Sequence, residues 1–302
     1  MLRRLISLFV FLAFLLPASL SAAFDLLSAV PAQYEVVASL DTRKMLDSPA
    51  FQRLWAQHKK PQTDAQLALI KSLTGVDVLK DIDRVSLFSR VNDDASVGVV
   101  FEGRFDSAKL LLLVQANATY KSYALNGQTL HEWFDDKEQR TKYAAFPAPG
   151  TLMIWNSRQA AEASTSAMAT PANSLGASKD AARVPADASS QAMWGVLITR
   201  QETCPGAKLR LTAATMTMQM EGENVTMAMR AVPESAPVAA QWLDLARGTK
   251  ALLQIQRDNP AAAELANLVS VTPLEEGRVV EMKLTTTADR LVTLAQQMKQ
   301  AK

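Results

Sequence analysis

Residues 83–114, DRVSLFSRVNDDASVGVVFEGRFDSAKLLLLV, contain the pattern that decides the fold. Hydrophobic residues alternate with other residues in two runs, 83–91 and 96–105, and this period of two predicts two β-strands. Asp106 or Ser107 follows the second run in the position of a helix N-cap, ahead of an apolar stretch. The segment therefore predicts a strand, a turn, a second strand and a helix.

The same order of elements recurs along the chain. Residues 209–248 predict two strands and a helix that ends at Gly248, because glycine readily adopts the left-handed conformation that stops helices. Residues 269–298 predict a third copy. A shortened copy has one strand at 35–40 and a helix that begins at 47–49, Asp-Ser-Pro, where a capping serine precedes proline.

These units predict an α+β fold with two related domains. Each domain is expected to be a mainly antiparallel sheet with helices packed on one face, because strand-strand-helix units with short turns bury one side of a sheet. The first domain is placed at 24–163 and the second at 191–302. Residues 164–190 are rich in Ala and Ser and predict a linker or a long exposed loop. Residues 121–155 predict a strand meander that completes the first sheet.

The N-terminal segment has the pattern of a secretory signal peptide. Two arginines precede an apolar run at 5–16, Pro17 follows it, and the small residues at 21–23 suit a cleavage site after Ala23. The run is shorter than the roughly 20 residues that a membrane-spanning helix needs. We therefore expect residues 1–23 to be removed and the mature protein to be soluble, periplasmic or secreted, without a membrane span.

The charge balance argues against nucleic acid as a partner. The chain has 32 Lys and Arg residues and 30 Asp and Glu residues, and the predicted signal peptide contains two of the arginines. The mature chain then has no net charge that would attract DNA or RNA. The single cysteine, Cys204, rules out a disulfide within the chain, and we interpret it as an incidental loop residue.

Common catalytic motifs are missing from the sequence. The 11 glycines never form G-x-G, and no G-x-S-x-G or S-x-x-K motif occurs. His58 and His131 are the only histidines, too few for a typical zinc site. The sequence assigns no catalytic, cofactor-binding or metal-binding residue and predicts a protein that is not an enzyme. A hydrolase with a dispersed site remains an alternative, and it requires a histidine beside a carboxylate in a pocket.

Acidic residues cluster in two places, without the spacing of a known calcium loop. At Asp77, Asp81 and Asp83 we expect helix capping by the first residue and solvation of a strand edge by the last. The second cluster is Asp135 and Asp136.

Two further charged residues lie within the predicted strand at 96–105. Glu102 and Arg104 share one face of this strand, because residues two apart in a strand point to the same side. We expect them to form a surface ion pair worth about 0.5 kcal/mol.

Methionines form an alternating stripe in the second domain. We interpret the stripe as core packing beneath the helices, because thioether side chains fill irregular gaps and a half-buried strand requires this alternation. The alternative is a periplasmic Cu(I)-binding site, since thioether sulfur selects this soft ion. The pattern leaves both interpretations open for Met216, Met218, Met220, Met227 and Met229, with Met282 on the corresponding strand of the last copy.

Three segments resemble a class of exported bacterial proteins. They are GVDVLKDIDRV at 75–85, VVFEGRFDSAKL at 99–110 and VPADASSQAMWG at 184–195. The resemblance implies tandem α+β repeats and an envelope or extracellular location, and that class has no established biochemical activity. We therefore expect a non-enzymatic interaction or structural module of the cell envelope, with an envelope protein as its partner.

Overall fold

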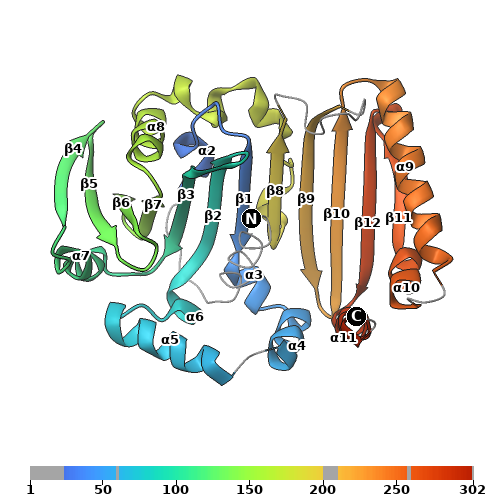
Figure 1. Cartoon of the computed structure of the whole chain (residues 1–302), viewed down its shortest axis with the longest axis horizontal. Helices are drawn as coiled ribbons and strands as arrows, with labels where there is room; N and C mark the ends of the chain where they lie inside the picture. The colour runs from blue at the N-terminus through green and yellow to red at the C-terminus, as the bar shows by residue number, and fades with distance from the viewer. Residues whose placement is uncertain (1–23, 59–60, 200–209, 257–259, 301–302) are drawn as a thin grey trace. The chain divides into compact units, whose positions relative to one another are not determined.

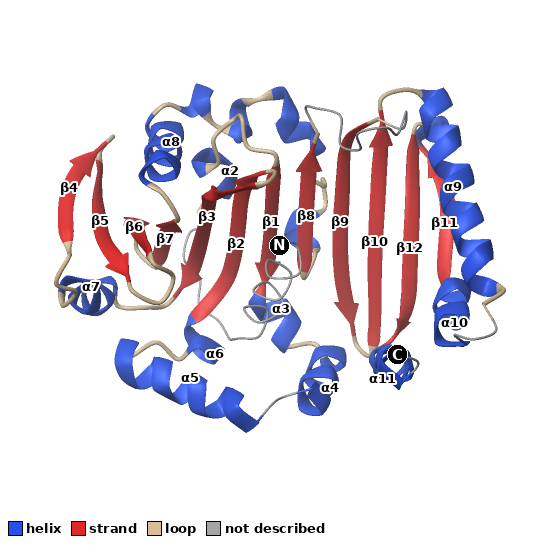
Figure 2. Ribbon diagram, in the orientation of Figure 1, coloured by secondary structure: helices blue, strands red, loops and turns tan. Residues whose placement is uncertain are grey.

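The computed structural model describes residues 24–58, 61–199, 210–256 and 260–300. Its elements confirm the α+β class (Figures 1 and 2). Cys204 and the predicted signal peptide lie outside the described residues.

Contacts divide the described chain into two compact units. Unit 1 contains residues up to Leu46 together with 61–182, and unit 2 contains 47–58 together with the residues from Arg183 onward. The expected boundaries differ from these units in two respects, because 47–58 lie with the second unit and 164–182 lie with the first. This assignment depends on contacts between residues far apart in the chain, which the local sequence pattern does not predict.

The sheet of unit 1 is antiparallel throughout, in the order β1-β2-β3-β7-β6-β5-β4. Strands β4 to β7, which are the last four strands of unit 1 along the chain, form the predicted meander and extend the sheet beyond β3. The strands are β1 (Val36–Asp41), β2 (Ile82–Arg90), β3 (Asp93–Gly103), β4 (Lys121–Leu125), β5 (Gln128–Asp135), β6 (Arg140–Ala148) and β7 (Thr151–Trp155).

Helices of unit 1 contact this sheet and one another. Helix α8 contacts α2 and strands β3, β6 and β7, and α5 contacts α6 and α7. Two of the predicted caps are present, since the Asp106 carboxylate accepts hydrogen bonds from the first turn of α7 and Asp77 does the same for α6. The third is wrong, because the buried Ser48 hydroxyl forms no hydrogen bond with any described residue. The helices are α2 (Leu26–Ala29), α3 (Thr42–Leu46), α5 (Pro61–Thr74), α6 (Val78–Asp81), α7 (Ser107–Gln115) and α8 (Arg158–Ala169).

The deepest part of unit 1 is a row of side chains across four neighbouring strands. Val37, Phe88 and Trp155 are fully buried on one face of β1, β2 and β7. Gly98 of β3 lies between Phe88 and Trp155 in this row, and a Cβ atom there would approach the Phe88 ring to 2.4 Å. Glycine is therefore required at this point so that the two rings can close over the strand.

Residues 164–182 of the segment expected to be a linker instead belong to unit 1 and supply buried residues to it. Residues 164–169 belong to α8, and the Ser164 hydroxyl donates to the carbonyl oxygen of Ala29 at 2.6 Å. Leu175 is fully buried, and its backbone N–H donates to the Val30 carbonyl at 2.7 Å. The small residues of this stretch permit close packing, which composition alone does not distinguish from a linker. Short 3-10 helices continue the segment at Pro171–Asn173, Leu175–Ala177, Lys179–Arg183 and Ala188–Ser190.

The sheet of unit 2 is also antiparallel, in the order β11-β12-β10-β9-β8. Helix α9 continues through Gly248 and is therefore longer than the sequence predicts. The elements are α4 (Pro49–His58), β8 (Met193–Ile198), β9 (Leu211–Glu221), β10 (Asn224–Pro233), α9 (Ala236–Gln254), α10 (Pro260–Leu268), β11 (Val269–Leu274), β12 (Val279–Thr287) and α11 (Ala288–Gln300).

Helix α4 attaches to the β9–β10 hairpin and to α11. Ala50 is fully buried in a cluster with Val225 and Ala288, and its backbone N–H donates to the carbonyl oxygen of Gly222 in the hairpin turn. Arg53 forms ion pairs with Glu223 at 3.0 Å and with Asp289 at 2.7 Å. These contacts explain why 47–58 belong to unit 2.

Candidate functional site

A polar row crosses the sheet of unit 1 at one end of its buried face. Asp41 of β1, Arg84 of β2, Glu102 of β3 and Thr151 of β7 are successive register partners. Directly paired residues of antiparallel strands point to the same side, so these four side chains lie next to one another. They continue the face that carries the fully buried Trp155.

The polar row lines a small cleft of about 170 Å³. Arg43 and Asp83 flank it and form an ion pair at 2.9 Å. Arg84 lies 3.6 Å from Glu102, and Asp41 pairs with Lys44 at 3.3 Å. The guanidinium and carboxylate groups of the cleft are thus paired with one another or with Lys44.

Two glycines allow the backbone to pass close beneath the cleft. The Gly103 N–H donates to the Gly150 carbonyl at 2.8 Å. A Cβ atom at Gly103 would lie 1.9 Å from the backbone oxygen of Asp81, and one at Gly150 would lie 2.2 Å from that of Gly103. Gly150 also has a φ of 70°, a conformation that L-residues with a side chain rarely adopt. Larger residues at these two positions would push the strands apart.

Glu102 is the least solvated acid of the cleft. Its burial raises the pKa of the carboxyl group, and the positive charge of Arg84 opposes this shift. Oε1 accepts a hydrogen bond from the backbone nitrogen of Phe24 at 3.1 Å. Oε2 is buried and accepts no hydrogen bond from any described residue. A buried carboxylate oxygen without a donor is costly, so this atom is prepared to accept one more hydrogen bond.

The sequence pattern does not reveal this cleft, and the predicted ion pair of Glu102 with Arg104 is wrong. Glu102 faces Arg84 across the β2–β3 pair, whereas the guanidinium of Arg104 contacts the backbone oxygen of Lys80. Residues two apart in a strand are separated by roughly 6.6 Å, but direct cross-strand partners have Cβ atoms about 5 Å apart. The strand pairing β2–β3 was predicted, and its register would have revealed the Arg84–Glu102 pair.

The predicted acidic clusters take structural roles. Asp77 caps α6 and pairs with Lys71 at 2.7 Å, while Asp81 accepts a hydrogen bond from the Asp77 backbone. Asp83 does not solvate a strand edge as expected, since it pairs with Arg43 in the cleft. Asp135 accepts hydrogen bonds from the β5–β6 turn. Among the described residues, no three His, Cys, Asp or Glu side chains are grouped to hold a metal ion.

His131 lies on β5, away from the cleft. Its exposed fraction is 7%, its Nδ1 shares a hydrogen bond of 2.9 Å with the Tyr120 hydroxyl, and its ring stacks on Tyr120. Burial lowers the pKa of this imidazole. The residues that line the cleft do not include His131, so the structure does not join this histidine to the carboxylates there. His58 is the last residue of α4.

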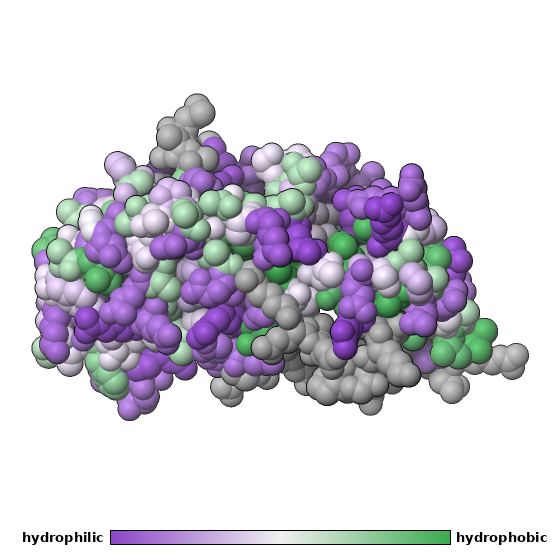
Figure 3. All heavy atoms as spheres, turned by 90° about the horizontal axis from the view of Figure 1, so that it is seen from above, coloured by the Kyte–Doolittle hydropathy of each residue, from purple (hydrophilic) through white to green (hydrophobic). Residues whose placement is uncertain are grey.

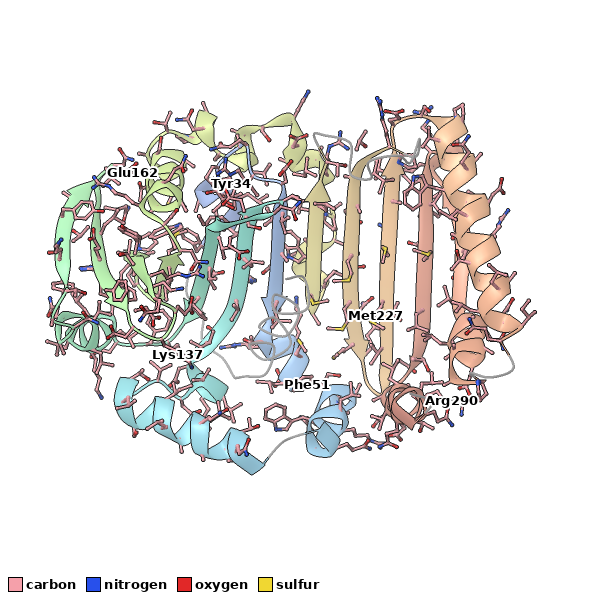
Figure 4. The ribbon with its side chains drawn as sticks, viewed as in Figure 1. Tyr34, Phe51, Lys137, Glu162, Met227 and Arg290 are labelled. Carbon is pink, nitrogen blue, oxygen red and sulfur yellow. The ribbon has the colours of Figure 1, made fainter. Side chains whose placement is uncertain are left out.

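The methionine stripe divides into a packed part and an exposed part. Met218, Met220 and Met227 pack against the cluster of Ala50, Val225 and Ala288. Met216 and Met229 face each other across β9 and β10 with exposed fractions of 43% and 45%, and Met282 of β12 is the next partner of Met229. Figure 4 shows Met227 on β10 and sulfur atoms on the neighbouring strands. The core interpretation therefore describes only the first group.

Large apolar side chains are exposed on three helices. In unit 1 they lie on α5 and α7, which contact each other, and in unit 2 they lie on α9. The surface visible in Figure 3 is mainly hydrophilic, with hydrophobic residues in small groups. The residues with the greatest exposure are Leu69, Leu73, Leu112, Leu245, Leu252 and Ile255. No helix among the described residues has the length and hydropathy to cross a membrane.

Comparisons with known proteins found similarity only at the level of structure. No protein-family model matches the chain, and no curated protein matches its sequence. Crystal form III of TP0453 is similar with a TM-score of 0.49 at 11% identity, over 91% of this chain and 99% of that chain. Crystal form I of TP0453 has a TM-score of 0.46 at 13% identity, over 91% of this chain and 98% of that chain.

Proposed function

We propose that this chain is an exported, non-enzymatic interaction module of the bacterial cell envelope. The observation that supports this proposal is the exposed apolar surface on α5 and α7 of unit 1. Leu69 and Leu73 of α5 are each 57% exposed, and Leu112 of α7 is 65% exposed. Side chains of this size on contacting helices favour a site that a partner covers.

Each of the two helices also has an inward apolar side. Leu67 of α5 and Leu110 of α7 pack against the buried cluster of Val76, Ile82 and Val85. The helices therefore already bury one apolar side, and the exposed leucines are not needed to attach them to the sheet. An apolar surface in addition to the packed one is typical of a helix that contacts a second molecule.

The charges near this surface favour a protein partner over a lipid surface. Interfacial helices that bind anionic lipid are rich in Lys and Arg on their polar side. Helix α5 has one acidic residue, Asp64, and one basic residue, Lys71, which is already paired with Asp77. The partner is therefore expected to be an envelope protein with a complementary apolar groove.

Site-specific photo-crosslinking in the exported protein tests this proposal. A photoreactive residue at position 69 or 112 is expected to form an adduct with one defined envelope protein, while the same residue at the exposed Asp136 turn forms none. Leu69→Ser combined with Leu73→Ser is expected to abolish the adduct formed at position 112, with an unchanged circular dichroism spectrum. Adducts with lipid alone, or equal adducts at all three positions, would contradict a protein partner.

The exposed methionines support a second candidate function, periplasmic Cu(I) binding. Met216, Met229 and Met282 lie in one row across β9, β10 and β12. Side chains in such a row have Cβ atoms about 5 Å apart, and flexible thioethers from three strands can converge on one ion. Two or three thioether ligands suit Cu(I) because both ligand and ion are soft.

Competition with a Cu(I) chelator under reducing conditions separates the two groups of methionines. Met216→Leu combined with Met229→Leu is expected to remove Cu(I) uptake. The matched control, Met218→Leu combined with Met227→Leu, changes packed methionines and is expected to leave uptake unchanged. Uptake that survives the first pair of substitutions would refute this second function.

A further inference from the structure

Phe24 is tied to the polar cleft by its backbone nitrogen. This nitrogen donates to Oε1 of Glu102 at 3.1 Å, a contact between residues that lie 78 positions apart. The next residue, Asp25, caps α2 by accepting a hydrogen bond from the Leu27 N–H at 3.2 Å. The N-cap of helix α2 therefore directly follows Phe24, and both of these hydrogen bonds lie within unit 1.

This same nitrogen is the one that signal-peptide cleavage after Ala23 would free. We propose that export completes the cleft with the chain's own N-terminus: the α-ammonium group of mature Phe24 binds the carboxylate of Glu102. The inference rests on the export that is part of the proposed function. It takes the cleavage after Ala23 that the sequence predicts and adds a binding site for the new terminus.

The chemistry of the acceptor supports an ammonium group over a peptide N–H. A peptide nitrogen carries one proton, and Glu102 already uses it at Oε1, which leaves the buried Oε2 without a donor. An α-ammonium group carries three protons and a positive charge. It can therefore serve both oxygens of one carboxylate and also neutralise a charge that burial disfavours.

The surrounding charges are balanced, so the ammonium group would act on Glu102 as a hydrogen-bond donor. The carboxylates that line the cleft are those of Asp41, Asp83 and Glu102, and the guanidinium groups are those of Arg43 and Arg84. Lys44 pairs with Asp41 at 3.3 Å from outside the lining, so each of the three carboxylates has one cation beside it. Arg84 is held 3.6 Å from Oε2, beyond hydrogen-bonding distance, so it does not take the place of the ammonium group.

The processing step is a hydrolysis that an exported-protein endopeptidase performs with water. The C–N bond between Ala23 and Phe24 breaks, the hydroxyl of water joins the Ala23 carbonyl carbon, and the Phe24 nitrogen gains protons to become an ammonium group. No oxidant or reductant takes part. Cleavage takes place before the nitrogen is enclosed, and folding of unit 1 then brings the new cation to Glu102, where the Phe24 nitrogen lies in the structure.

Measurements on the exported mature protein test this proposal. Intact-mass analysis and N-terminal sequencing are expected to show Phe24 as the first residue. The α-amine is expected to have a pKa about one unit above the ordinary range near 8, because the carboxylate stabilises the charged form. At pH 7 this shift predicts roughly tenfold slower acylation of the α-amine than in Glu102→Gln, which removes the negative charge.

Two controls keep this test independent of folding and of the proposed function. Glu132→Gln changes an acid on β5 and is expected to leave the acylation rate unchanged. A mature chain with one extra alanine before Phe24 keeps Glu102 and is expected to show an ordinary amine pKa. A mature N-terminus at another residue, or equal acylation rates in all four chains, would overturn the inference. Neither result depends on whether crosslinking finds a partner.

Discussion

The side chains of Ser39 and Ser86 form a hydrogen bond of 2.9 Å between two neighbouring strands inside unit 1. They are register partners on β1 and β2, with exposed fractions of 3% and 0%. The pair lies between the fully buried row that contains Phe88 and the charged row that contains Arg84. Along β1 and β2 this face of the sheet therefore changes from apolar to neutral polar to charged over three successive rows.

Removal of both hydroxyls from this pair is expected to cost less than the sum of the losses from Ser39→Ala and Ser86→Ala alone. Ser86→Ala leaves the Ser39 hydroxyl buried without its partner, which costs about 1–3 kcal/mol of unfolding free energy. The double substitution Ser39→Ala with Ser86→Ala removes both polar groups together. Urea unfolding of the four proteins should give a double-mutant loss smaller than the sum of the single losses. Strictly additive losses would contradict the pairing.

Substitution of Gly103 is expected to disrupt the floor of the cleft. Gly103→Ala places a Cβ 1.9 Å from the backbone oxygen of Asp81, and backbone cannot move aside as a flexible side chain does. A loss of about 4 kcal/mol or more in the unfolding free energy is expected. Gly127→Ala is the matched control, because Gly127 has positive φ but open space around it, and should cost about 1–2 kcal/mol. Similar losses for the two would argue against the close approach.

His131 is expected to make unit 1 less stable as the pH falls. Burial holds the pKa of the folded imidazole below the value near 6.5 of the unfolded chain. The unfolded state therefore binds more protons below about pH 6.5, so the stabilisation present above this pH is lost as the pH falls through the folded pKa. His131→Gln should reduce the slope of unfolding free energy against pH in this window, by at most about 1.4 kcal/mol per pH unit. Identical slopes in both proteins, measured by urea unfolding, would contradict this role.

The N-cap of α7 is expected to contribute measurably to stability. The Asp106 carboxylate accepts hydrogen bonds from the backbone N–H groups of Ala108 and Lys109, at 2.9 and 3.2 Å. Asp106→Ala should lower the unfolding free energy by about 1 kcal/mol, while Asp106→Asn should retain most of it, since asparagine is also a good cap. Chemical denaturation of the three proteins provides the measurement. Equal stability of the alanine and asparagine variants would exclude a capping role.

Local features of the chain were predicted where they depend on residues close in sequence. The alternation within 83–105 predicted β2 and β3, and Asp106 predicted the start of α7. The meander at 121–155 was also predicted, because short turns join its strands. Helix α5 was missed, since its apolar residues lie on two sides and give no single amphipathic stripe.

The sequence by itself determined the strands, the caps and the α+β class, because periodicity and capping act within a few residues. Only the tertiary structure decided that helix α4 belongs to unit 2, that the methionine stripe is half packed and half exposed, and that Glu102 meets Arg84 and Phe24. Those contacts join residues up to 236 positions apart, as in the Arg53–Asp289 ion pair of α4 and α11. They follow from strand register and from the closure of the core, which place distant side chains at one point in space.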